Sequence, residues 1–174
     1  ALLIGAFSDN FATNVLIRRV GLENVADQVE KLGYRNSGLH DFLRWPRPAK
    51  APRTLSTGTA AEISDFMSRH AKDEFWDEST NEVFRRWLGA GADTSMVASA
   101  FDLDPLAHYN YQRDVWVWNK TGTNGTIRAD AGIVMTPQRR VAYAVFANWE
   151  PGTDRVVDVM PVMRAAGDAI HRFL

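Results

Sequence analysis

The stretch VWVWNKTGTNGTIRADAGIVMTPQRRVAYAVFAN, residues 115–148, decides the fold class of this chain. Residues 115–118, 127–135 and 140–148 are rich in β-branched and aromatic side chains, which favour strands. The Pro-Gln-Arg segment at residues 137–139 suits a hairpin turn between the last two of these strands. The stretch therefore predicts a three-stranded antiparallel meander.

Helical patterns lie on both sides of this predicted sheet. Apolar residues recur at helical spacing, and Thr59 with Glu62 matches the capping box that opens many helices. Residues 37–56 contain three prolines and are expected to form a long irregular loop. The expected helices cover residues 10–20, 23–32, 59–72, 79–88, 94–100 and 158–173. Helices followed by a meander and a closing helix predict an α+β fold in which the last helix packs on the sheet.

The composition is that of a soluble globular protein and excludes several classes of function. The 174 residues suffice for a sizeable core, and 20 Lys and Arg against 21 Asp and Glu leave no basic surface for a nucleic acid. Without cysteine there is no thiolate zinc site, and the histidines show no metal-ligand spacing. These are His40, His70, His108 and His171. No apolar run is long enough to cross a bilayer, so we expect no metal, no cofactor and no membrane span.

Two tripeptides carry the chemistry: S-D-N at residues 8–10 and K-T-G at residues 120–122. Their surroundings read SDNFATNVLIRRVG from residue 8 and WNKTGTNGTIRADAGIV from residue 118. In order, separation and context they resemble two signatures of the serine β-lactamase and penicillin-binding protein superfamily, and of class A β-lactamases in particular. The resemblance extends from Ala1 to Leu174. It implies a β-lactamase-like fold and a serine hydrolase that works through an acyl-enzyme.

The resemblance gives Ser8 and Lys120 catalytic roles. Ser8 would carry a proton to the nitrogen that leaves the substrate. Lys120 would lie beside it, where its ammonium stabilises negative charge on Ser8 and attracts a substrate carboxylate. Asn10 would donate a side-chain hydrogen bond to the acylamide carbonyl of the substrate. The alternative is structural, because S-D-N alone is a common helix N-cap.

The same resemblance assigns substrate binding to the residues after Lys120. Thr121 would hydrogen-bond a carboxylate, Gly122 would let the substrate lie against an edge strand, and the backbone N–H of Thr123 would be an oxyanion-hole donor. Arg128 would point back toward the carboxylate. Here too the alternatives are structural: the segment after Lys120 is a strand end and turn with positive φ at residues 124–125, and Arg128 is a solvated charge.

Three residues of the predicted sheet are interpreted as structural. Asp130 is a candidate hydrogen-bond partner within the fold. Trp116 and Trp118 lie two residues apart, which places them on one face of a strand as core or sheet cover.

One element of the family pattern is missing. The nucleophile lies in an S-x-x-K motif upstream of S-D-N, and none of the four lysines has a serine three residues before it. The sequence also starts with ALLIGAF, an apolar run that reads as the middle of a buried helix. Residues 1–174 are therefore expected to form the C-terminal portion of a single β-lactamase-like domain, inactive alone, whose partner is a missing N-terminal segment that carries the nucleophile.

The residue that would activate water for deacylation also departs from the pattern. Class A enzymes carry a glutamate in the loop that follows the S-D-N helix, whereas Asp41 is the only acid in the Pro-rich loop. Asp41 is either a shorter general base or an ion-pair residue of the loop. Without a base, the complete protein would be acylated by penicillins and would release them slowly.

The resemblance leaves three functions open. The first is hydrolysis of a small-molecule β-lactam or peptidoglycan-like substrate. The second is a D-Ala-D-Ala peptidase or esterase of the penicillin-binding type. The third is a catalytically degenerate domain that binds a ligand. Because the family is typically exported, a periplasmic or secreted protein is expected.

Overall fold

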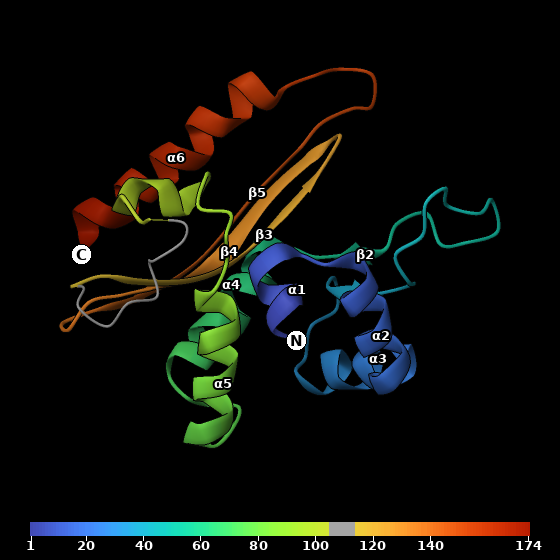
Figure 1. The fold of residues 1–174 in the computed structure, drawn as a ribbon, viewed down its shortest axis with the longest axis horizontal. Coiled ribbons are helices and arrows are strands. Elements are labelled where there is room, and N and C mark those ends of the chain that lie inside the picture. The colour runs from blue at the N-terminus through green and yellow to red at the C-terminus, as the bar shows by residue number, and fades with distance from the viewer. Residues whose placement is uncertain (105–113) are drawn as a thin grey trace.

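The computed structural model describes residues 1–104 and 114–174, and the elements in these ranges follow the expected order (Figure 1). Helices come first, three long strands follow, and a helix closes the chain. The bounds are α1 Leu2–Phe7, α2 Asn10–Val20, α3 Leu22–Lys31, β1 Gly38–Leu39, β2 Ser56–Thr57, α4 Ala60–Ala71, α5 Glu78–Gly89, the 3-10 helix η1 Val97–Phe101, β3 Trp116–Asn124, β4 Ile127–Met135, β5 Arg140–Asn148 and α6 Val156–Phe173. The predicted α+β class is confirmed.

The three long strands form an antiparallel sheet in the order β3-β4-β5, as the sequence predicts. The pairing places Lys120 opposite Ala131 and Thr121 opposite Asp130. The strand predicted at residues 115–118 was too short, because β3 pairs with β4 as far as Asn124. Within the described ranges β3 is therefore an edge strand, and the K-T-G residues lie on it.

The turn between β3 and β4 differs from the expected one. Neither Asn124 nor Gly125 has a positive φ, so that part of the structural alternative is wrong. Instead, Oδ1 of Asn124 accepts a hydrogen bond from the backbone N–H of Thr126 at 2.7 Å. This side-chain turn supports the reversal without a left-handed residue.

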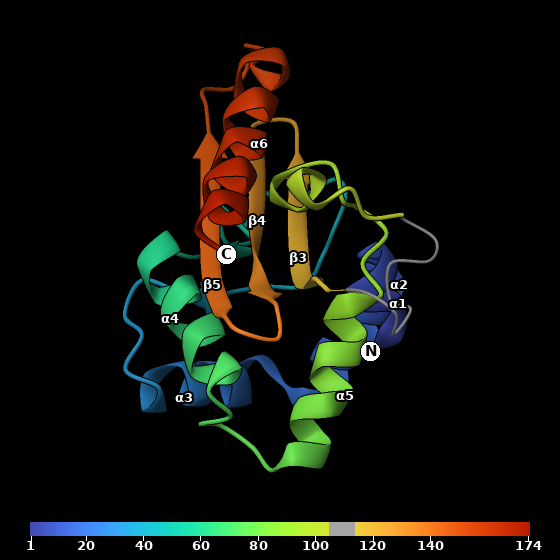
Figure 2. The same cartoon turned by 90° about the vertical axis from the view of Figure 1, so that its left-hand side faces the viewer.

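Helices cover both faces of the sheet, and α6 runs along one of them (Figure 2). Side chains alternate along the strands, so Val117 and Val134 face η1 and α6, whereas Trp118 and Ile133 face α4 and α5. Trp118 packs on Gly89 of α5, where an added Cβ would lie 3.0 Å from the ring. Trp118 is thus partly buried and covers this face of the sheet, which is one of the two roles expected for it. The core has two halves, one on each face of the sheet.

Two connections between the elements contain irregular structure. Residues 40–55 form the expected irregular loop, which β1 and β2 close at its base. The helix predicted at residues 94–100 is instead the shorter η1. The helix is shorter for a local reason. Oδ1 of Asp93 accepts hydrogen bonds from the backbone N–H and the hydroxyl of Ser95 at 3.1 and 2.7 Å. Such bonds compete with the helical ones.

Across the described parts of the chain, no helix is both long and apolar enough to cross a membrane.

Candidate active site

Ser8 lies at the junction of two helices that the S-D-N tripeptide builds. It ends α1 in the left-handed conformation, with φ 53° and ψ 38°, and its N–H donates to the carbonyl of Ile4 at 3.1 Å. Asp9 then opens α2, because its Oδ1 accepts from the N–H of Ala12 at 2.6 Å. The capping and catalytic interpretations of the tripeptide are therefore compatible: Asp9 is the cap, which leaves the Ser8 side chain free to contact other elements.

The position of Ser8 is set by the packing of α1 on α5. At Gly5 an added Cβ would lie 2.1 Å from the carbonyl oxygen of Trp87, so the two backbones are in close contact. The carbonyl of Ala6 also accepts a hydrogen bond from the N–H of Ala92 at 2.9 Å. The close backbone contact and the hydrogen bond together hold α1 against α5 and the connection that follows it. They thereby also fix the position of Ser8 at the end of α1.

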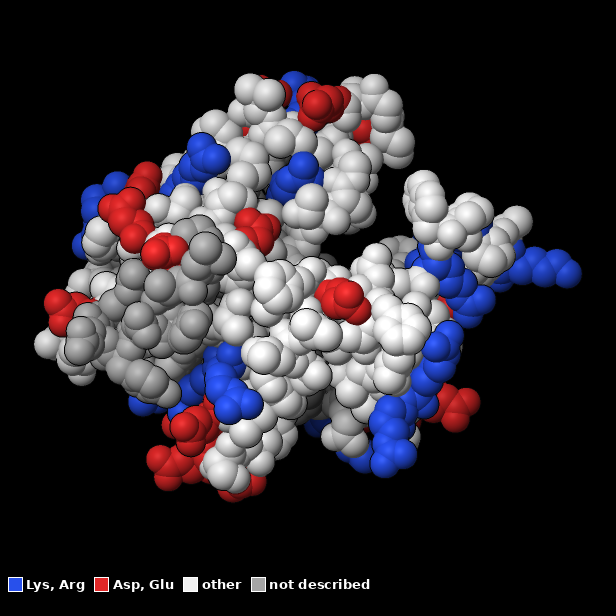
Figure 3. Space-filling model, in the orientation of Figure 1, with Lys and Arg blue, Asp and Glu red and all other residues white. Residues whose placement is uncertain are grey.

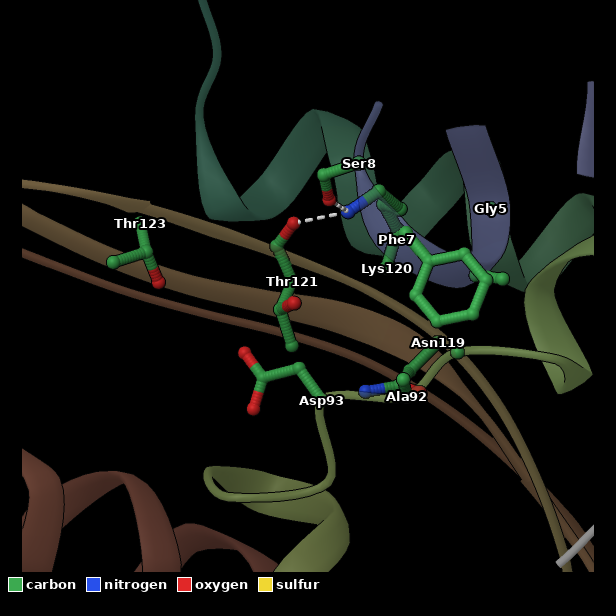
Figure 4. A pocket seen from close by; sticks show the side chains of 11 residues that line it. Gly5, Phe7, Ser8, Ala92, Asp93, Asn119, Lys120, Thr121 and Thr123 are labelled. Carbon is green, nitrogen blue, oxygen red and sulfur yellow. Dashed lines mark hydrogen bonds between the residues drawn. The ribbon is translucent and has the colours of Figure 1, made fainter. Parts of the chain in front are cut away.

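Strand β3 brings Lys120 to Ser8 across 112 residues of sequence. The ammonium Nζ donates one hydrogen bond to Oγ of Ser8 and another to the carbonyl of Thr121, the latter at 2.6 Å (Figure 4). The sequence predicted that these two residues lie together, and the geometry brings them together.

A cavity of about 470 Å³ opens at this contact. Its walls come from the end of α1, from the connection after α5 and from β3 (Figure 4). The lining residues are Gly5, Ala6, Phe7, Ser8, Gly91, Ala92, Asp93, Asn119, Lys120, Thr121 and Thr123. Of the predicted site residues, four lie in this lining: Ser8, Lys120, Thr121 and Thr123.

Burial and neighbouring charges shift the pKa of Lys120 in opposite directions. Burial lowers the pKa of Lys120, while the negative charges of Asp93 and Asp130 raise it again without restoring the usual value. Burial raises the pKa of Asp93, but hydrogen bonds from Ser95 and Thr121 and the charge of Lys120 outweigh it and leave that pKa below normal. The cavity lining therefore contains an ammonium and a carboxylate, each of which shifts the pKa of the other.

Asp93 is a cavity residue that the sequence reasoning missed. Its only sequence signal is the Asp-x-Ser pattern at residues 93–95, which is common in turns and does not point to a site. Only the tertiary packing of the connection after α5 against β3 brings its carboxylate beside Thr121, as Figure 4 shows.

Three predicted substrate-binding residues lie outside the cavity lining. Asn10 is exposed at the start of α2. Gly122 lies on β3, where an added Cβ would meet only Cβ of Ala129 at an ordinary 3.5 Å. The guanidinium of Arg128 donates to the carbonyls of Asn124 and Ile127 at 2.6 and 2.8 Å and lies over the ring of Trp149. In this structure Arg128 binds the hairpin, and its predicted role toward a carboxylate remains a prediction.

Asp41 is buried within the loop and pairs with two arginines. Its Oδ1 lies 2.9 Å from Arg44 and its Oδ2 2.8 Å from Arg47. Burial raises its pKa, but the N–H of Phe42 and the two guanidinium groups outweigh burial and lower the pKa below the usual value. Of the two alternatives for Asp41, this geometry is that of the ion pair.

The described residues offer no group of three His, Asp or Glu side chains that could hold a metal ion. Of the four histidines, His108 lies outside these ranges.

With fold and site in place, the class of the protein follows. A sequence model of the beta-lactamase enzyme family matches residues 2–174, so the chain belongs to this family. No sequence among curated proteins matches the chain.

Solved structures show the same fold at low sequence identity. The beta-lactamase from Sphaerobacter thermophilus superposes with a TM-score of 0.78 at 20% identity, covering 99% of this chain and 62% of that one. PBP-A gives 0.76 at 20% identity with coverages of 98% and 58%, and the class A beta-lactamase from Mycobacterium abscessus gives 0.73 at 18% with 98% and 61%. The chain thus spans about three fifths of the length of these structures.

Proposed function

We propose that this chain supplies the proton-transfer and substrate-binding side of the active site of a β-lactamase-like serine hydrolase. The reaction would cleave a β-lactam or a related amide or ester through an acyl-enzyme. The observation that carries the proposal is the hydrogen bond from Nζ of Lys120 to Oγ of Ser8 at the mouth of a cavity. Family membership supports the same chemistry.

The Ser8–Lys120 pair suits the protonation of a leaving group. When a serine nucleophile attacks the carbonyl carbon, the C–N bond breaks and the nitrogen needs a proton. Ser8 would give that nitrogen its hydroxyl proton, and the adjacent ammonium of Lys120 would stabilise the oxygen that remains. The proton released by the attacking serine would then restore the hydroxyl of Ser8. A half-buried ammonium does this better than a solvated one, because charges interact more strongly at low dielectric.

The remaining lining residues suit a small anionic substrate. A cavity of about 470 Å³ lies within the range usual for small-molecule sites. Lys120 and Thr121 would bind a carboxylate, and the N–H of Thr123 would donate to the oxyanion. Asn10, Gly122 and Arg128 are proposed to contact substrate from outside the cavity lining, as the family resemblance implies.

The nucleophile of the proposed reaction must come from outside residues 1–174, because they contain no S-x-x-K. An exposed apolar surface supports the proposal that a further segment of the same domain packs against these residues. The centre of the face in Figure 3 is largely uncharged, and large apolar side chains are exposed on α1 and α2. These are Leu2, Leu3, Phe7, Phe11, Val15, Leu16 and Val20. Contiguous apolar surface of this kind usually marks an interface. As the family is typically exported, we also propose an exported protein.

One observation favours a second function, a penicillin-binding protein that deacylates slowly. Both carboxylate oxygens of Asp41 are held by Arg44 and Arg47, and its pKa is lowered. A carboxylate in this state is a weak base for activating water. Another of the similar solved structures, a point mutant of PBP-A, is described as an acyl-enzyme complex with penicillin G.

The test compares residues 1–174 alone with the protein that includes the residues preceding Ala1 in its gene. Nitrocefin turnover and covalent labelling by a fluorescent penicillin are measured on both. We expect labelling only in the longer protein, and Lys120→Ala lowers the labelling rate by about 10²- to 10³-fold. Lys72→Ala, which removes a lysine at the end of α4, is the matched control and leaves the rate unchanged.

Labelling with turnover supports the hydrolase, whereas labelling without turnover supports the penicillin-binding alternative. A longer protein that shows neither signal refutes both.

A further inference from the structure

Asp130 of β4 is a carboxylate with 0% of its surface exposed, and it pairs in the sheet with the cavity residue Thr121. Its Oδ2 accepts a hydrogen bond from the N–H of Val97 at 3.0 Å. Its Oδ1 accepts from Nδ2 of Asn119 at 2.9 Å and from the hydroxyl of Tyr143 at 3.0 Å. Burying a carboxylate is unfavourable unless such donors surround it. Here they come from three separate segments.

One of these segments forms a wall of the cavity, and another directly follows a wall. Val97 begins η1 immediately after the connection that carries Asp93, and Asn119 precedes Lys120 on β3 and itself lines the cavity. Tyr143 attaches the same carboxylate to β5. One buried side chain therefore joins the connection that carries Asp93 to the strand that carries Lys120.

The sheet leaves room for this arrangement at Gly132. Gly132 lies between Asn119 on β3 and Tyr143 on β5 in the strand register. An added Cβ would lie 2.7 Å from Cβ of Asn119 and 2.4 Å from the carbonyl oxygen of Trp118. Only glycine therefore lets the two donors approach the carboxylate from both neighbouring strands.

Asp130 also belongs to a set of interacting charges. Burial raises its pKa to about 6, and the charge of Asp93 acts in the same direction. The carboxylate in turn favours the protonated form of Lys120. It also raises the pKa of Tyr143, after the larger effect of burial. Among the described residues, the titratable groups that act on Asp130 or respond to it are thus Asp93 on the connection, Lys120 on β3 and Tyr143 on β5.

We propose that Asp130 is a positioning residue of the cavity, which holds the Asp93 connection and the Lys120 strand together and provides a fixed negative charge that favours the Lys120 ammonium. The inference rests on the proposed function for its catalytic consequence. The effect of the Asp130 charge on the titration of Lys120 can be measured without any reaction.

The test follows Lys120 by NMR in the chain labelled with ¹³C at the lysine Cε positions. The sequence has four lysines, and Lys120→Arg assigns the relevant signal. In the wild type the Lys120 signal should show an extra inflection near pH 6, where Asp130 titrates. In Asp130→Asn that inflection should vanish and the pKa of Lys120 should fall by about one unit, because a nearby opposite charge is lost.

Two further variants separate a charge effect from a loss of stability. Val134→Ala removes buried packing on the same face of the sheet and should leave both the inflection and the pKa of Lys120 unchanged. Tyr143→Phe removes one donor and keeps the charge. Since that hydrogen bond lowers the pKa of Asp130, the inflection should move to higher pH. Tyr143→Phe also serves as the test if Asp130→Asn does not fold.

An inflection that persists in Asp130→Asn, or one that Tyr143→Phe does not move, overturns the proposal. The outcome is distinct from that of the proposed function. A longer protein that is never acylated, but whose Lys120 follows Asp130 as described, refutes the hydrolase and leaves the positioning role intact.

Discussion

Gly5→Ala tests whether the contact between α1 and α5 positions Ser8. The added methyl would lie 2.1 Å from the carbonyl oxygen of Trp87. An ordinary separation between carbon and oxygen is about 3.3 Å, so α1 must move away from α5 by about 1 Å. Because the obstructing atom belongs to the backbone, it cannot rotate away.

The expected loss of stability is about 2 kcal/mol. Overpacking costs about 1–3 kcal/mol, and the upper end applies to a clash between backbones. The better helix propensity of alanine offsets about 1 kcal/mol of this cost. For a chain of this length, the corresponding fall in Tm is about 4–8 °C. Denaturant unfolding gives the free energy, and the ¹³C signal of Lys120 shows whether its contact with Ser8 is lost.

Gly125→Ala is the matched control. Gly125 has no atom within 4 Å of the added Cβ and no positive φ, so its substitution should be close to neutral. If Gly5→Ala unfolds within about 0.5 kcal/mol of the wild type and leaves the Lys120 signal in place, the packing argument for Ser8 fails.

Three further predictions concern the surrounding scaffold. Asn14→Ala removes two hydrogen bonds of 2.8 Å that join α2 to Leu43, and should lower the free energy of unfolding by about 1–3 kcal/mol and speed hydrogen exchange at Leu43. Thr59→Ala removes the cap that accepts from the N–H of Glu62 and should cost about 1 kcal/mol in denaturant unfolding. Burial and, to a smaller extent, the charge of Arg85 lower the pKa of His70 in the folded state. On acidification His70 therefore binds a proton at higher pH in the unfolded state than in the folded state. The stability of the wild type should therefore fall from about pH 7 to about pH 5, and His70→Gln should lack this slope.

The sequence predicted those parts of the fold and site that depend on local patterns. Segments rich in β-branched and aromatic residues indicate the meander, and Thr59 with Glu62 indicates the start of α4. The sequence predicts that Ser8 and Lys120 lie together because each belongs to a motif of the resembled family. Their contact across 112 residues could not be derived from either motif by itself.

Asp93 and Asp130 show what local patterns could not predict. Asp93 reaches the cavity only because the connection after α5 packs beside β3, and no periodicity encodes that packing. Asp130 was interpreted as a structural partner, but its donors Val97, Asn119 and Tyr143 lie in three different segments. The positive φ expected at Asn124 and Gly125 is absent, and the turn instead contains a hydrogen bond from the N–H of Thr126 to the Asn124 side chain.

The alternation of side chains along β3 has a consequence for any ligand. Lys120 lies on the side of the sheet that carries α1 and Ser8, whereas Thr121 lies on the opposite side with Asp93. Because β3 is the edge strand of the described sheet, side chains from both of its faces line one cavity at its rim. A single small ligand in this cavity can therefore lie against an ammonium from one face of the sheet and a carboxylate beside the other.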